Sequence, residues 1–114
     1  TVFDNVKDNF TIMKEEPFGP LVPLLTFKDF DEVIERANNN DLGLCSYIYT
    51  NNLERANRAS ELMETGCVAV NTAAVAVAEA PFGGIKQTGY GREGGSMAIK
   101  DYLNIKYTHF GISY

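Results

Sequence analysis

The spacing of apolar residues predicts an amphipathic helix from about Asp31 to Asn39. Asp29 precedes this segment and Glu32 follows three positions later, which resembles a capping box at a helix N-terminus. The apolar positions recur at intervals of three, four and seven, which places them on one helix face: Phe30, Val33, Ile34 and Ala37. Such a stripe implies a sheet or another helix to pack against.

A second helix is predicted after Asn51 or Asn52, either of which can cap its N-terminus. Its inner face has the same helical spacing, at Leu53, Ala56, Ala59 and Met63. Gly66 stands where a helix C-terminus favours a residue in the left-handed conformation, so we expect the helix to end there.

Two short runs of aromatic, β-branched and small apolar residues flank this second helix and predict strands. They cover Leu44–Thr50 and Cys67–Asn71. A strand, a helix and a strand in this order form a βαβ unit, whose strands are parallel and whose connection is right-handed. A further strand is expected at Pro20–Phe27, near an edge because proline cannot donate to a ladder. The pattern predicts an α/β fold with a mostly parallel sheet and flanking helices.

The segment after Asn71 lacks periodicity for about 24 residues, which is longer than a simple connection. Loops at the carboxyl ends of parallel strands are where α/β proteins place their sites. At the mouth of this loop, Asn71 is expected to hydrogen-bond the loop backbone rather than a substrate. A short helix near Ser96–Leu103 and a strand near Ile105–Phe110 are predicted to complete the chain.

Length and charge narrow the class of protein. The 114 residues suit one domain, and ten basic against fifteen acidic side chains give a net charge of −5 without a long basic run, so a nucleic acid partner is not expected. The absence of a long apolar run and of a secretory leader predicts a soluble, cytoplasmic chain without membrane contact. Cys45 and Cys67 lie in apolar segments and are expected to be reduced and buried.

The segment TGYGREGG contains Gly89, Gly91 and Gly94 in the spacing of a dinucleotide-binding fingerprint. That fingerprint must follow a strand, open a helix and precede an acidic residue by about 20 positions. Here a turn-rich loop precedes it and only twenty residues follow Gly94. We therefore interpret these glycines as residues of a tight loop.

Other chemistries find little support in the sequence. His109 is the single histidine and has no serine or cysteine motif to pair with, so no catalytic triad is predicted. One histidine and two separated cysteines do not match the ligand spacing of a zinc site, and no metal is expected. Neither cysteine lies in the electropositive, exposed setting of a nucleophile.

Three stretches together resemble the C-terminal quarter of aldehyde dehydrogenases: MKEEPFGPLVPLLTF, CVAVN, and PFGGIKQTGYGREGG with IKDYLNIKY after it. The tail is most similar to that of NAD(P)-dependent succinate-semialdehyde dehydrogenases. The resemblance implies a partial catalytic domain over residues 1–103 and a tail at residues 104–114. It also implies that the nucleophilic cysteine and the general-base glutamate lie upstream, so we assign no catalytic residue here and expect this chain alone to be inactive.

The resemblance further implies that Glu16 binds the ribose of NAD or NADP and that Phe18 packs beside the nicotinamide. Without it, Glu16 would be interpreted as a solvated surface acid. Phe82 matches the wall of the aldehyde tunnel, although from the sequence alone it would be a core residue. Ala76 and Val77 stand where succinate-semialdehyde enzymes bring a serine, and a buried carboxylate without a polar partner is costly. A less polar aldehyde is therefore an alternative to succinic semialdehyde.

The final strand, residues 104–110, resembles the family's C-terminal strand, which joins the sheet of a neighbouring subunit. An exposed edge of this kind is a template for pairing, so a homo-oligomer is expected. A second hypothesis is a free-standing, non-catalytic α/β interaction module derived from such an enzyme.

Overall fold

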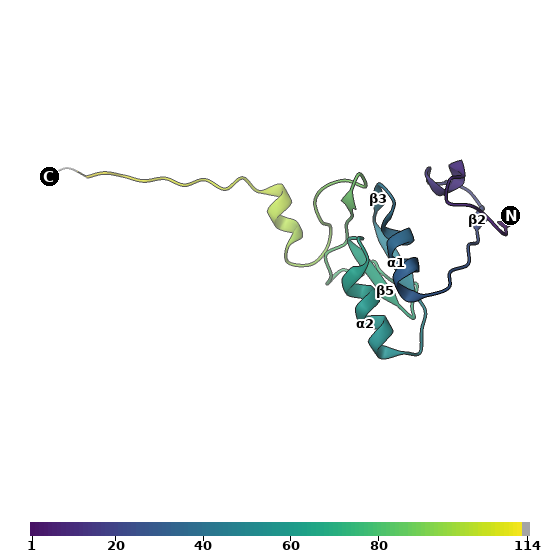
Figure 1. Cartoon of the computed structure of the whole chain (residues 1–114). Coiled ribbons are helices and arrows are strands. Elements are labelled where there is room, and N and C mark those ends of the chain that lie inside the picture. Colours follow the sequence, from purple (N-terminus) through teal and green to yellow (C-terminus); the bar gives the residue numbers. More distant parts are fainter. Residues whose placement is uncertain (113–114) are drawn as a thin grey trace.

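The computed structural model describes residues 1–112 and has a βαβ unit at its centre (Figure 1). Strands β4 (Cys45–Ile48) and β5 (Cys67–Val70) pair in parallel, and helix α2 (Leu53–Leu62) connects them. Helix α1 (Phe30–Asn38) precedes β4. The predicted α/β fold and the parallel pairing are confirmed.

Small side chains allow α2 to lie close to the sheet. Ala56 and Ala59 on the helix and Ala69 on β5 form the buried apolar core, each less than 8% exposed. Cys45 and Cys67, predicted to be buried, are free but only half-buried, so that prediction was wrong in degree. A two-stranded sheet shields its neighbouring side chains incompletely, which explains the difference.

Side-chain caps fix the predicted starts of both helices. The Asp29 carboxylate accepts a hydrogen bond from the Glu32 amide at 2.9 Å, and the Asn52 side chain accepts one from the Arg55 amide at 2.9 Å. At its other end, α2 stops at Leu62, so the prediction that Gly66 ends it was wrong. Close packing requires a glycine at position 66, because a Cβ atom on that residue would lie 1.9 Å from the Gly83 carbonyl oxygen.

Two further strand pairs lie outside the βαβ unit. Strand β1 (Val2–Phe3) pairs in parallel with β2 (Val22–Pro23), and β3 (Leu42–Gly43) pairs antiparallel with β6 (Ile85–Lys86). The strand expected at Pro20–Phe27 is therefore only two residues long, since its prolines cannot donate to a ladder. A 3₁₀ helix, η1 (Thr11–Met13), lies between β1 and β2.

The C-terminal segment extends away from the rest of the molecule (Figure 1). The predicted helix near Ser96–Leu103 is a shorter 3₁₀ helix, η2 (Ala98–Tyr102). Residues 104–110, predicted as a strand, form none in this single chain, because a strand requires a paired neighbour. Their large apolar side chains are exposed at Ile105, Tyr107 and Phe110.

Among residues 1–112, neither α-helix has the length and apolar character that crossing a bilayer requires.

Candidate functional site

The loop that follows β5 borders an open concavity of about 350 Å³. Its lining comes from the two arms of the loop, together with one residue before β4 and two from η2: Leu44, Phe82–Gly84, Thr88–Glu93, Asp101 and Tyr102. Phe82, the predicted substrate-pocket aromatic, is half-buried in this lining. Phe82 is therefore neither a fully buried core residue nor a fully exposed one.

Backbone bonds hold the two arms of the loop together. The Phe82 amide donates to the Glu93 carbonyl at 2.7 Å, and the Glu93 amide donates back to Phe82 at 2.7 Å. These reciprocal bonds fix the backbone from which the Phe82 ring projects.

Arg92 crosslinks the same loop, a role that the sequence pattern did not indicate. Its guanidinium donates to the carbonyls of Gly84 at 2.8 Å and Gly91 at 2.7 Å. Its own amide donates to the Asp101 carboxylate at 2.7 Å, which ties the loop to η2. All three partners lie within nine positions of Arg92, but nothing in the pattern of residue types shows that the loop folds back on this side chain.

The glycines of the fingerprint-like segment serve the turn, as predicted. Gly89, Gly91 and Gly94 have positive φ values of 128°, 86° and 71°. Residues with side chains rarely adopt this conformation. No α-helix begins at these glycines, as a dinucleotide fingerprint requires.

A second part of the loop, around Ala76 and Val77, lies beside Gly94 and Gly95. The Gly95 amide donates to the Ala78 carbonyl at 2.8 Å, and the Ala80 amide donates to the Val77 carbonyl at 3.2 Å. A Cβ atom on Gly94 would lie 2.8 Å from the Ala80 carbonyl oxygen. The structure thus packs the segment that carries Ala76 and Val77 against the arm that pairs with Phe82, and both side chains are exposed.

The Asn71 side chain joins the ends of β4 and β5. Its carbonyl oxygen accepts from the Thr50 amide at 2.9 Å, and its amide donates to the Thr50 carbonyl at 2.8 Å. Asn71 was predicted to bond the loop that follows it, whereas the backbone it bonds follows the neighbouring strand. Its φ of 55° is a conformation that asparagine tolerates better than most residues.

Lys86 anchors the loop to the end of α1. Its ammonium donates to the carbonyls of Asn38 at 2.7 Å and Asn40 at 3.0 Å, and pairs with Glu64 at 2.7 Å. A cation at a helix C-terminus satisfies carbonyls that lack helical partners and complements the helix dipole.

The predicted cofactor residues Glu16 and Phe18 lie in the segment between η1 and β2. Both are exposed, and the Phe18 side chain is 96% exposed. Neither lines the concavity beside Phe82. The concavity of this chain therefore contains the predicted substrate-pocket residue Phe82 and neither predicted cofactor residue.

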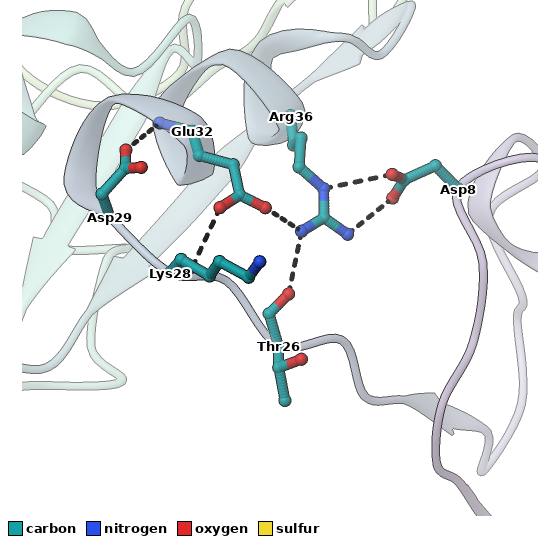
Figure 2. Close-up of polar contacts among 6 residues, drawn as sticks. All are labelled: Asp8, Thr26, Lys28, Asp29, Glu32 and Arg36. Atoms are coloured by element: carbon teal, nitrogen blue, oxygen red, sulfur yellow. Dashed lines mark hydrogen bonds and ion pairs between the residues drawn. The ribbon is translucent and has the colours of Figure 1, made fainter.

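Arg36 connects the N-terminal segment to α1 (Figure 2). Its guanidinium binds both Asp8 carboxylate oxygens, at 3.1 and 3.0 Å, and also donates to Glu32 and to the Thr26 carbonyl. The hydrogen bond to Asp8 raises the pKa of Arg36 further above its usual value. The two bonds between Arg36 and Asp8 hold the segment that leads to Glu16 against α1.

A cleft of about 380 Å³ lies beside this ion pair. It is lined by Asp8, Met13, Lys14, Arg36, Ala37, Asn39, Asn40 and Asp41.

Metal-ligating side chains do not gather in the part of the chain that the structure describes: no group of three or more His, Cys, Asp or Glu residues is placed to hold an ion. His109 contacts the Tyr107 hydroxyl at 3.4 Å in the exposed tail.

Comparison with known proteins shows that the model of the aldehyde dehydrogenase family matches residues 1–108. Among curated relatives, 3-sulfolactaldehyde dehydrogenase of Pseudomonas putida is 50% identical over 97% of this chain. The NADP(+) succinate-semialdehyde dehydrogenase of Escherichia coli (strain K12) is 46% identical over 98% of it. The chain spans 23% of the length of each relative.

Solved structures show the same similarity. An NAD+ complex of aldehyde dehydrogenase from Bacillus cereus superimposes with a TM-score of 0.88 at 45% identity. The superposition covers 92% of this chain and 21% of that structure.

Proposed function

Because the chain belongs to the aldehyde dehydrogenase family, we propose that it forms part of an enzyme that oxidises an aldehyde to a carboxylic acid with NAD or NADP. The family match over residues 1–108 carries this proposal. Since the chain spans less than a quarter of its relatives, the nucleophilic cysteine and the general base belong to the rest of such an enzyme. This chain then contributes binding surfaces and no reacting group.

In this proposal, Glu16 binds the nicotinamide ribose. A carboxylate accepts hydrogen bonds from two vicinal hydroxyls, and bonds to a charged acceptor are stronger than neutral ones. Phe18 supplies an apolar wall next to the ring. Their exposure supports this role, because groups that meet a separate molecule must be accessible in the chain that carries them.

Phe82, Ala76 and Val77 form the aldehyde side of the proposed site. The bonded loop supports this role, because it holds the half-buried Phe82 ring in a concavity and places the segment of Ala76 and Val77 against the same arm. Ala76 and Val77 offer no hydroxyl or charge to a distal carboxylate. Succinic semialdehyde and an uncharged aldehyde of similar length are therefore the two substrates to compare.

Residues 104–110 are proposed to pair with the sheet of a second copy. Exposed apolar side chains at Ile105, Tyr107 and Phe110 favour this, because an extended segment with free backbone groups is a template for strand addition. The same feature supports the second candidate function, a non-catalytic interaction module. Residues 1–103 would then be the unit that this tail brings into an assembly.

Turnover distinguishes the two candidates. The protein at its natural length is incubated with aldehyde and NAD+ or NADP+, and reduced nicotinamide is followed by absorbance. The enzyme proposal expects turnover by that protein and none by the 114-residue chain alone. Absence of turnover with every aldehyde and coenzyme, from a folded and coenzyme-saturated protein, contradicts the enzyme proposal and favours the module.

A further inference from the structure

Two cysteine thiols lie opposite each other on the parallel strands β4 and β5. Cys45 and Cys67 are register partners, so their side chains emerge on the same face of the sheet. Both are free and half-buried, and they are the two cysteines of the chain. The proposed oxidation of aldehydes gives this pair no role.

The strand spacing leaves room for an ion between the two free thiols. Neighbouring strands lie about 4.8 Å apart, whereas the sulfurs of a disulfide must approach to about 2 Å. Two metal–sulfur bonds of about 2.3 Å hold their sulfurs roughly 3.8 Å apart in tetrahedral geometry and about 4.6 Å apart in linear geometry. An ion can therefore join the two side chains without drawing the strands together.

The surroundings keep both thiols available and oriented. Burial raises the pKa of the Cys45 thiol, and the nearby Cys67 thiol raises it further, while the Tyr47 hydroxyl acts in the opposite direction. The Cys67 sulfur donates a hydrogen bond to the Gly83 carbonyl at 3.6 Å, which fixes the side chain beside the loop. Protonated thiols resist alkylation, yet a soft cation displaces their protons because it prefers sulfur ligands.

We propose that Cys45 and Cys67 together bind one soft, thiophilic cation. Each thiol releases its proton to solvent as a metal–sulfur bond forms, so one divalent ion displaces two protons and no oxidation state changes. Water fills the remaining coordination positions, since within residues 1–112 no group of three potential ligand residues is placed to hold an ion. The bound Cys67 can no longer donate to Gly83, so binding also removes one link between β5 and the loop.

A protection experiment on the unaltered protein tests this proposal with Cd²⁺ as the probe. The reduced, metal-free protein at its natural length is titrated with Cd²⁺ and alkylated with iodoacetamide, and each cysteine is quantified by peptide mass spectrometry. Cys45 and Cys67 are expected to lose reactivity together, at one Cd²⁺ concentration. Protection of only one of them, or of neither, overturns the proposal.

Variants then test whether the pair, rather than the number of thiols, creates the site. Cys45→Ser is expected to weaken Cd²⁺ binding at Cys67 about 100-fold, because the second sulfur acts at high effective concentration. Adding Ser60→Cys on the exposed surface of α2 restores the thiol count without the pairing, and binding is expected to stay weak. Cd²⁺ affinity that matches the unaltered protein in either variant overturns the proposal. Because the readout is binding, failure of the aldehyde-oxidation proposal would leave this test unaffected.

Discussion

Replacing Gly66 by alanine tests how closely β5 approaches the loop that carries Phe82. The added Cβ atom would lie 1.9 Å from the Gly83 oxygen, 2.8 Å from the Gly83 carbonyl carbon and 2.9 Å from the Gly84 Cα. All three atoms belong to backbone, so no side-chain rotation relieves the overlap. Restoring an ordinary contact requires the loop to move by more than 1 Å, since van der Waals contacts begin at about 3.4 Å.

The expected cost of Gly66→Ala follows from this forced movement. Overpacking of a well-packed site costs about 1–3 kcal/mol of unfolding free energy. Urea denaturation should therefore show a lower midpoint with an unchanged slope. Because the loop positions Phe82, we also expect KM for the aldehyde to rise in the protein at its natural length.

Gly111→Ala is the matched control, because its added Cβ atom meets no heavy atom within 4 Å. It should leave the midpoint unchanged. If Gly66→Ala behaves like Gly111→Ala in both stability and KM, the close approach of β5 and the loop is refuted.

Three further substitutions test separate parts of the molecule. Asn71→Ala removes two hydrogen bonds to Thr50, and should lower the unfolding free energy by roughly 1–2 kcal/mol in urea denaturation; an unchanged value would deny that these bonds join the strand ends. Glu16→Gln should raise KM for the coenzyme about 10-fold to 100-fold, through loss of a charged acceptor, while leaving stability unchanged; an unaltered KM argues against ribose binding. Val77→Ser should raise kcat/KM for succinic semialdehyde relative to an uncharged aldehyde by about tenfold, because a hydroxyl can bond the carboxylate. An equal change for both substrates would contradict the assignment of Val77 to the acyl end of the pocket.

Local sequence signals predicted the central elements well. The Asp29 and Asn52 caps and the apolar spacing depend on residues within a few positions of one another, so α1 and the start of α2 could be placed to within one or two residues. The positive φ values of the loop glycines were likewise implied by residue type.

Features that depend on distant partners were missed or misassigned. Gly66 was taken as the end of a helix, because the sequence does not show that Gly83 lies against it. Arg36 gained its role from Asp8, which lies 28 positions away and which folding brings near. Arg92 bonds carbonyls of its own loop, and the residue types alone do not reveal how that loop folds back. Residues 104–110 have strand-like composition but no partner within residues 1–112, so they form no strand here.

The site residues were predicted from the family resemblance and not from local sequence patterns. Phe82 lies in a concavity, whereas Glu16 and Phe18 are exposed residues outside its lining. Under the proposed function, the remainder of the enzyme and the bound coenzyme complete the site that these residues share.

A crystal structure of the protein at its natural length, with NAD+ or NADP+ and an aldehyde bound, is the most direct test of the proposed site. We predict that the Glu16 carboxylate accepts hydrogen bonds from the nicotinamide ribose and that the Phe82 ring contacts the aldehyde. A complex in which coenzyme and aldehyde bind away from both side chains would contradict this assignment.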